Sequence, residues 1–291
     1  MKNHLLIGFF AIAGIAPAMA ADFPVKATPA MPVVRPIYDW TGLYLGINGG
    51  GAWSQNCMTM KGYNVPVISI NGSPFLGVSN VSNASEGCNN ATGGVVGGQI
   101  GYRYQTTTGF VFGIEAQGDW ADLKGSNASP VLGNVNAFLA GLPAPFTGAA
   151  SLTNTSKVDG IGMFKGQVGY ALGPVLLYVT GGAAVTHNKY TGFASANVGQ
   201  LASATLSDAG SAIRFGEVAG AGLDWMFAPN WTVGVEYNHL FMGSQQVGMA
   251  YTGNTLNFPG LTAANIAGIP SRTESISGDI DMVTARIGYK F

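Results

Sequence analysis

Charged side chains are rare in this chain, and seven of them form the set expected to face inward from segments that alternate between apolar and polar residues. Only 9% of the 291 residues are charged, against about 25% in an ordinary soluble domain. Because successive residues of a β-strand face opposite sides, we expect these charges to line one face of a sheet. The set comprises Arg103, Glu115, Asp119, Lys165, Asp224, Glu236 and Arg286.

The sequence leaves two roles open for these luminal charges. Charges inside a narrow barrel can form salt bridges that fill it, since buried charges need partners, or they can line a channel that selects ions. Glu115 and Asp119 are of the type used in acid–base catalysis, but no nucleophile or metal-ligand set accompanies them at a recognisable spacing. We therefore expect no catalytic centre, no metal site and no cofactor.

Two histidines, His187 and His239, fall near the expected outer ends of two strands. Histidines at a rim can ligate haem iron, and a lipid hydrolase would need a serine close to a histidine. No His-x-Ser pattern occurs after His239, where Ser244 is the first serine. Ring side chains are common at the membrane interfaces of barrels, and this structural role requires neither a ligand nor a reaction at the histidines.

Both cysteines, Cys57 and Cys88, lie in the first expected long connection. Their spacing excludes a C-x₂-C metal site. A disulfide would stabilise this connection by roughly 3–4 kcal/mol in the chain-entropy model, and export from the cytoplasm would allow it to form.

The N-terminus has the pattern of an exported protein. Lys2, an apolar run and Ala18-Met19-Ala20 predict a signal peptide over 1–20, cleaved after Ala20. An extended, Pro-containing periplasmic leader is expected over 21–37, and a barrel over 38–291. The net charge of −1 lacks the basic excess of a nucleic-acid binder.

Spanning helices are not predicted, although the mean hydropathy of +0.25 indicates a membrane. The longest uncharged stretch, Gly166–Asn188, contains Gly173-Pro174, which would disrupt a helix but suits a turn between two strands. In lipid, an apolar exported chain without spanning helices can pair all its backbone hydrogen-bonding groups by forming a closed β-barrel.

Eight alternating segments have the length of membrane strands. They are Trp40–Trp53, Val95–Gln105, Phe110–Ala121, Ile161–Tyr170, Val175–His187, Arg214–Phe227, Trp231–Phe241 and Asp279–Phe291. Short turns are expected at Gln105–Gly109, Ala171–Pro174 and Ala228–Asn230, and long connections at Ser54–Gly93, Asp122–Ser156, Asn188–Ser211 and Met242–Gly278. This alternation predicts an all-β, eight-stranded antiparallel transmembrane outer-membrane β-barrel with short periplasmic turns and long extracellular loops.

Aromatic residues gather near the expected strand ends. Tyr289 and Phe291 end the last strand, and the five tryptophans lie at similar positions, as in the aromatic girdles of such barrels. The tryptophans are Trp40, Trp53, Trp120, Trp225 and Trp231.

Several of these segments resemble the outer-membrane immunogenic proteins of alphaproteobacteria, the small porin-family barrels. The similar segments are Tyr38–Gly46, Leu177–Ala184, Asn230-Trp231 with Glu236-Tyr237, and Arg286–Phe291. The resemblance implies an eight-stranded barrel whose terminal Phe291 is recognised by the barrel-assembly machinery, and some members of the family are thought to bind haem. The sequence departs from the resembled family on the fourth expected strand, where it has Lys165-Gly166-Gln167 and many members of that family have a pattern similar to Arg-Gly-Arg.

Three functions remain open at this level. The first is a surface barrel with a filled lumen, contributing to envelope structure and surface interaction. The second is a narrow pore for ions or small solutes, and the third is a loop-mediated receptor for a ligand such as haem. The expected partners are outer-membrane lipids, lipopolysaccharide and the assembly machinery, without nucleic acid, in a Gram-negative outer membrane.

Overall fold

The computed structural model describes residues 38–63, 69–70, 73–74, 83–130, 134–137, 146–198, 202–257 and 267–291. The chain divides into two units, Met1–Pro36 and Ile37–Phe291. The expected signal peptide and leader lie outside the described residues. Within the described residues, the structure contains no helix with the length and apolarity of a membrane crossing.

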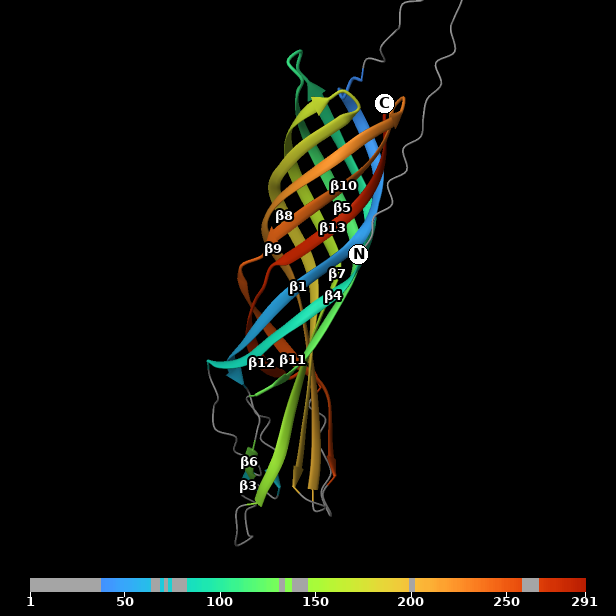
Figure 1. The fold of residues 1–291 in the computed structure, drawn as a ribbon. Helices are drawn as coiled ribbons and strands as arrows, with labels where there is room; N and C mark the ends of the chain where they lie inside the picture. Colours follow the sequence, from blue (N-terminus) through green and yellow to red (C-terminus); the bar gives the residue numbers. More distant parts are fainter. Residues whose placement is uncertain are drawn as a thin grey trace, which may run out of the picture. The chain divides into compact units, whose positions relative to one another are not determined.

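Every regular element of the described part is a strand (Figure 1). The strands are β1 Gly42–Tyr63, β2 Ser69–Ile70, β3 Ser73–Pro74, β4 Ala84–Gln105, β5 Phe110–Ser129, β6 Asn134–Ala137, β7 Phe146–Leu172, β8 Val175–Val198, β9 Ala202–Ala228, β10 Trp231–Phe241, β11 Ser244–Asn257, β12 Pro270–Ser277 and β13 Ile280–Lys290. The all-β prediction is confirmed.

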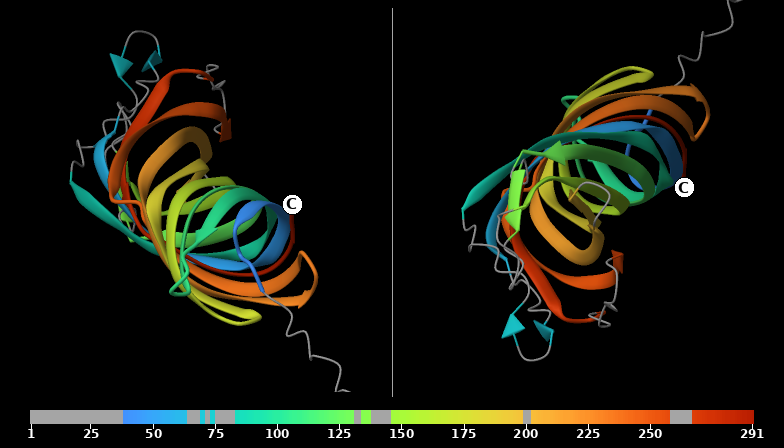
Figure 2. Two further views of the ribbon diagram at one scale, coloured as in Figure 1. Left: turned by 90° about the horizontal axis from the view of Figure 1, so that it is seen from above. Right: turned by 90° about the horizontal axis from the view of Figure 1, so that it is seen from below.

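Antiparallel pairing closes the sheet into a barrel. In the described part of the chain, β1, β4, β5, β7, β8, β9, β10 and β13 form a ring in which each strand pairs with the next, and β13 pairs with β1. Seen along the barrel, the strands wind around a shared interior (Figure 2). Closure pairs every strand on both sides and leaves the ring without an edge.

The sequence alternation sets which side chains face outward. On β1, Leu45 and Ile47 are 44% and 66% exposed, whereas Tyr44 and Asn48, which flank them, are buried. The other ring strands repeat this pattern and produce a wall of exposed aliphatic and aromatic side chains. We call this wall the apolar belt; it extends from the short turns to the level of Trp53, Trp120 and Phe215.

The predicted short turns lie together at one end of the barrel, with the C-terminus (top of Figure 1). Gly173 turns the chain from β7 to β8 at a φ of +63°, and Asn230 turns it from β9 to β10 at +66°. Glycine and asparagine tolerate this left-handed conformation better than other residues, so the local sequence specifies tight reversals there.

The structure differs from the predictions at the opposite end, where strands occupy much of the expected long connections. The strands β1, β4, β5, β7, β8 and β9 all continue beyond the apolar belt, and β11 and β12 lie within the expected Met242–Gly278 loop. There, β11 pairs with β9, and β12 pairs with β1, so they prolong the barrel wall. The polar outer face of this extension lacks the apolar alternation from which membrane strands are predicted.

Candidate functional site

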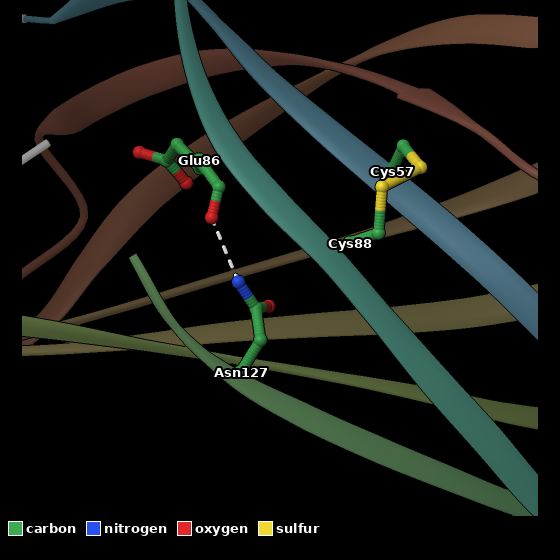
Figure 3. Close-up of a disulfide and its surroundings, with 4 residues drawn as sticks. All are labelled: Cys57, Glu86, Cys88 and Asn127. Atoms are coloured by element: carbon green, nitrogen blue, oxygen red, sulfur yellow. Dashed lines mark hydrogen bonds between the residues drawn. A yellow bond between two sulfur atoms is a disulfide. The ribbon is translucent and has the colours of Figure 1, made fainter. Parts of the chain in front are cut away.

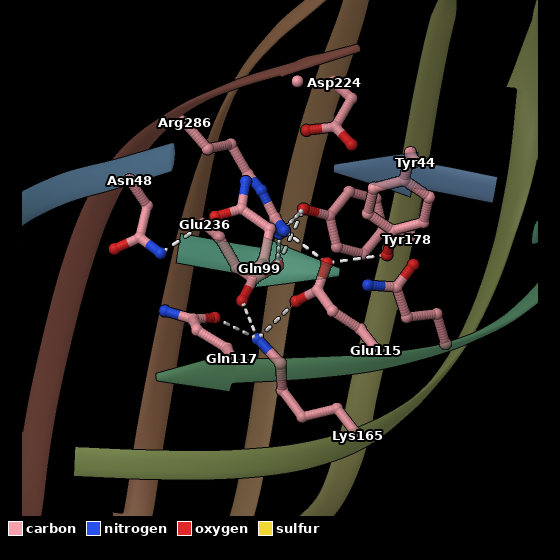
Figure 4. Close-up of polar contacts among 12 residues, drawn as sticks. Tyr44, Asn48, Gln99, Glu115, Gln117, Lys165, Tyr178, Asp224, Glu236 and Arg286 are labelled. Carbon is pink, nitrogen blue, oxygen red and sulfur yellow. Dashed lines mark hydrogen bonds and ion pairs between the residues drawn. The ribbon is translucent and has the colours of Figure 1, made fainter. Parts of the chain in front are cut away.

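The candidate site is a layer of polar side chains inside the barrel, to which each strand of the closed ring contributes (Figure 4). We call it the luminal charged layer. Its members are Tyr44, Arg103, Glu115, Lys165, Tyr178, Asp224, Glu236 and Arg286, and none is more than 7% exposed. Each occupies an inward position of its alternating strand, which is how the fold brings residues from distant parts of the sequence together.

The centre of the layer alternates positive and negative charges. The Lys165 ammonium lies 3.0 Å from Glu115 and also pairs with Glu236. The Arg286 guanidinium pairs with the same two carboxylates. Two cations thus neutralise two anions, and hydroxyls complete the carboxylates' hydrogen bonds: Tyr44 donates to Glu115 at 2.7 Å, and Tyr178 to Glu236 at 2.8 Å.

Arg103 extends this layer towards the short-turn end of the barrel. Its guanidinium forms a 2.7 Å ion pair with Asp224 and donates a 3.0 Å hydrogen bond to Gln167. It also lies 4.5 Å from the centre of the Tyr44 ring and 5.2 Å from that of Tyr178, positions suited to cation–π contacts. Gln167 of β7 therefore accepts a hydrogen bond from Arg103 across the lumen.

Asp119 lies apart from these ion pairs. Its carboxylate accepts a 2.9 Å hydrogen bond from the amide of Gln117, whereas Glu115 is held by Lys165 and Arg286. Glu115 and Asp119, the two carboxylates considered for acid–base catalysis, thus have separate partners. The arrangement gives each of these carboxylates fixed partners.

Clusters of buried apolar side chains lie in the lumen on both sides of the charged layer. Towards the strand extension lie Ala52, Ala91, Val95, Ala121, Leu123, Val158, Ile161, Met163, Ala184, Val218, Leu240, Met242, Ile280 and Met282. Towards the short turns lie Trp40, Val111, Leu176 and Met226, which pack with the Tyr178 ring of the charged layer. The girdle prediction is therefore wrong for Trp40, which is 1% exposed, packs with Leu176 and donates its indole N–H to the Gly173 carbonyl at 3.3 Å.

A second buried network lies in the strand extension, where the sequence predicted loops. Arg272 lies 2.9 Å from Glu86, 2.8 Å from Asp208 and 3.2 Å from Glu274. Three carboxylates thus surround one guanidinium. Burial, together with the neighbouring Glu86 carboxylate, raises the pKa of Glu274 to about 8. The alternation of Arg272, Glu274 and Ile276 with smaller polar residues was the signal that could have revealed an inward face.

The disulfide joins Cys57 and Cys88, which face each other in the β1–β4 ladder (Figure 3). It therefore links two paired strands of the extension, where a loop was expected. Beside it, Asn127 of β5 donates a 2.7 Å hydrogen bond to the Glu86 carbonyl of β4. The two contacts tie three neighbouring strands together beyond the apolar belt.

The histidines lie on the outer surface, each with its own carboxylate. His187 pairs with Asp159 through Nδ1, and His239 lies 2.7 Å from Asp281 through Nδ1. Among the described residues, no group of three histidine, cysteine or carboxylate side chains has the arrangement of a metal site. At the end of the chain, the Phe291 amide donates to the Leu43 carbonyl at 2.8 Å, and Phe291 is 64% exposed.

Comparisons with known proteins agree with this architecture. Residues 9–291 match the family model described as the outer membrane protein beta-barrel domain. The 31 kDa outer-membrane immunogenic protein of Brucella melitensis is 32% identical over 253 residues, covering 85% of this chain and 90% of the relative. Its Brucella suis counterpart gives the same values.

Among solved structures, OprG of Pseudomonas aeruginosa aligns with 87% of this chain and 97% of its own, at 13% identity and a TM-score of 0.36. Ail of Yersinia pestis aligns with 84% of this chain and 99% of its own, at 10% identity and a TM-score of 0.28. The family match and the Brucella relatives indicate a Gram-negative outer membrane. This chain belongs to the outer membrane protein beta-barrel domain family.

Proposed function

We propose that the protein is a surface barrel with a closed lumen, which contributes to envelope structure and presents the strand extension to contacts outside the cell. One observation carries this proposal: the luminal charged layer draws a side chain from each strand of the ring, and clusters of buried apolar side chains lie on both sides of it. An ion would have to separate buried ion pairs and then cross an apolar layer, and both steps are unfavourable.

The narrow pore is the alternative, in which Arg103, Lys165 and Arg286 line a water path. Conductance of the refolded mature barrel in a planar bilayer separates the two. We expect no discrete current steps from the wild type. Steps whose ion selectivity changes in a Lys165→Gln variant would refute the closed lumen.

The conductance assay needs a variant that can conduct. Met163→Ser and Met282→Ser together remove two side chains of the extracellular apolar layer, and Arg286→Ala removes the central guanidinium. We expect small currents from this triple variant, provided that its gel mobility still changes with heating as a folded barrel's does. Currents in the triple variant and silence in the wild type would support the proposal.

The second alternative is a receptor that binds haem through the rim histidines. Both histidines already contact a carboxylate, so the geometry favours a structural role. Haem binding that is lost in a His187→Ala, His239→Ala variant would support the receptor. We propose no catalytic activity.

We further propose an alphaproteobacterial origin, export through a signal peptide cleaved after Ala20, and assembly directed by the last strand with Phe291. Lipids, lipopolysaccharide and the assembly machinery are the proposed partners. A surface position would also suit an antigen, as the name of the Brucella relatives describes for those proteins. Surface labelling of intact cells would test the exposed position.

A further inference from the structure

Three lysines stand side by side on the outer surface of the barrel, just beyond the apolar belt. Lys124 of β5 is the direct ladder partner of Lys157 of β7, which in turn is the partner of Lys189 of β8. Their side chains are 60%, 38% and 55% exposed. Like charges placed opposite each other destabilise a sheet, so strand pairing itself gives no reason for this lysine row.

Two aspartates balance the lysine row only in part. Asp122 lies 3.0 Å from Lys124 and 3.1 Å from Lys157, and Asp159 lies 2.7 Å from Lys189. Each ammonium has three N–H donors, and each of these contacts uses one. The lysine row therefore keeps a surplus positive charge and further donors for an anion with several oxygens.

An apolar groove lies on the same strands, nearer to the membrane. It has a volume of about 490 Å³ and is lined by Gly118, Trp120, Gly160, Gly162, Val185 and Ile213, among others. Trp120 is 77% exposed at its edge. At Gly118 the groove is open space, since a Cβ added to this residue would meet no atom within 4 Å.

The register places the groove and the lysine row close together. Trp120 pairs with Gly160, and Gly160 pairs with His187. The lysines follow two to four residues further along the same strands, which is about 7–13 Å at the usual rise per residue. An apolar groove that faces the bilayer is thus topped by a positive row at the level of the lipid headgroups.

We propose that this surface binds a phosphorylated lipid of the outer leaflet, with the phosphate on Lys124, Lys157 and Lys189 and an acyl chain in the groove beside Gly118. Charge complementarity selects the headgroup, because lysine ammonium groups bind phosphate oxygens. The apolar, lipid-facing groove selects an acyl chain over a soluble partner. This site is independent of whether the lumen conducts.

The first test uses the refolded mature barrel in phosphatidylcholine nanodiscs, with bis-phosphorylated lipid A as the probe. Native mass spectrometry at several probe concentrations gives the affinity. We expect the Lys124→Gln, Lys157→Gln, Lys189→Gln variant to bind about 30-fold more weakly or worse, because each lost charged hydrogen bond weakens binding several-fold. Lys61→Gln, which changes an exposed lysine of β1, is the control and should bind as the wild type.

The second test separates the lipid from a free anion. Gly118→Leu fills the groove without a backbone clash, and Gly248→Leu on β11, where a Cβ also meets nothing within 4 Å, is its matched control. We expect Gly118→Leu to weaken lipid A binding and Gly248→Leu to leave it unchanged.

Three results would overturn the proposal: dephosphorylated lipid A binding as tightly as the intact probe, wild-type affinity in the triple lysine variant, or no effect of Gly118→Leu while inorganic phosphate displaces the probe. Gel mobility with and without heating confirms that each variant is folded.

Discussion

Replacing Lys165 by methionine should destabilise the barrel strongly, because the change breaks the charge balance of the luminal layer. The ammonium is fully buried and lies 3.0 Å from Glu115, while it also pairs with Glu236. Without it, two buried carboxylates share only the Arg286 guanidinium. Removing one partner of a buried ion pair costs about 3–5 kcal/mol, and we expect this loss in the free energy of unfolding.

A second substitution tests whether charge balance is the cause. Glu236→Gln added to Lys165→Met leaves Arg286 facing Glu115 alone, so that one cation again faces one anion. The double variant should therefore be more stable than the sum of the single effects predicts, by roughly 2–3 kcal/mol, within the range measured for directly coupled residues.

Urea unfolding of the barrel in lipid vesicles, followed by tryptophan fluorescence and gel mobility, measures all four proteins of this cycle. Lys61→Met, which changes an exposed lysine, should alter stability by no more than about 0.5 kcal/mol. Strictly additive effects of Lys165→Met and Glu236→Gln would refute the reasoning, because residues that do not share a charge balance contribute independently.

Three further changes probe other parts of the barrel. Glu274 has a pKa of about 8 in the folded protein and about 4.3 when unfolded, so its contribution to stability is full below the unfolded pKa and is lost as the pH rises through 8. Glu274→Gln should flatten this dependence between pH 5 and 8 in urea titrations, and an unchanged slope would assign the pH dependence elsewhere. Reduction of the Cys57–Cys88 disulfide, whose cysteines are 31 residues apart, should lower the free energy of unfolding by about 3–4 kcal/mol, as measured with and without a reductant. If the reductant destabilised a Cys57→Ser, Cys88→Ser variant equally, its effect would come from a side reaction and not from the disulfide. Gly182→Ala should destabilise by about 1–3 kcal/mol, because its Cβ would lie 2.0 Å from the Phe164 carbonyl oxygen, whereas Gly118→Ala has open space; equal thermal stability of the two variants would contradict this geometry.

The sequence predicts the membrane-level part of the fold well, because lipid imposes a simple rule there. Leu45 and Ile47 face lipid and Tyr44 faces the interior, so hydropathy alternates along the strand. Beyond the apolar belt the outer face of the wall is mostly polar, while apolar side chains such as Met58, Val247 and Ile276 pack inside, so the lipid-facing alternation no longer marks the strands. The extension of β8 and β9 was therefore expected to be a loop.

The charged members of the luminal layer could be identified from the sequence, but their pairing could not. An isolated charge at an inward position, such as Lys165 or Arg286, is conspicuous in an apolar strand. Its partner depends on the register and shear of the whole ring, which no local pattern contains. The apolar layer was missed for another reason: Ile161 and Met163 face inward while Phe164 faces lipid, so both faces of β7 are apolar there.

The pairing of β13 with β1 has a consequence for assembly. Apart from this pair, neighbours in the ring follow one another along the chain, so they can associate as successive hairpins. The last pair joins Tyr44 to Lys290 and can form only when the end of the chain is in place. A barrel truncated before β13 would leave β1 and β10 as unpaired edges, and such edges pair readily with other chains. Loss of the final strand should therefore produce intermolecular aggregates instead of a smaller barrel.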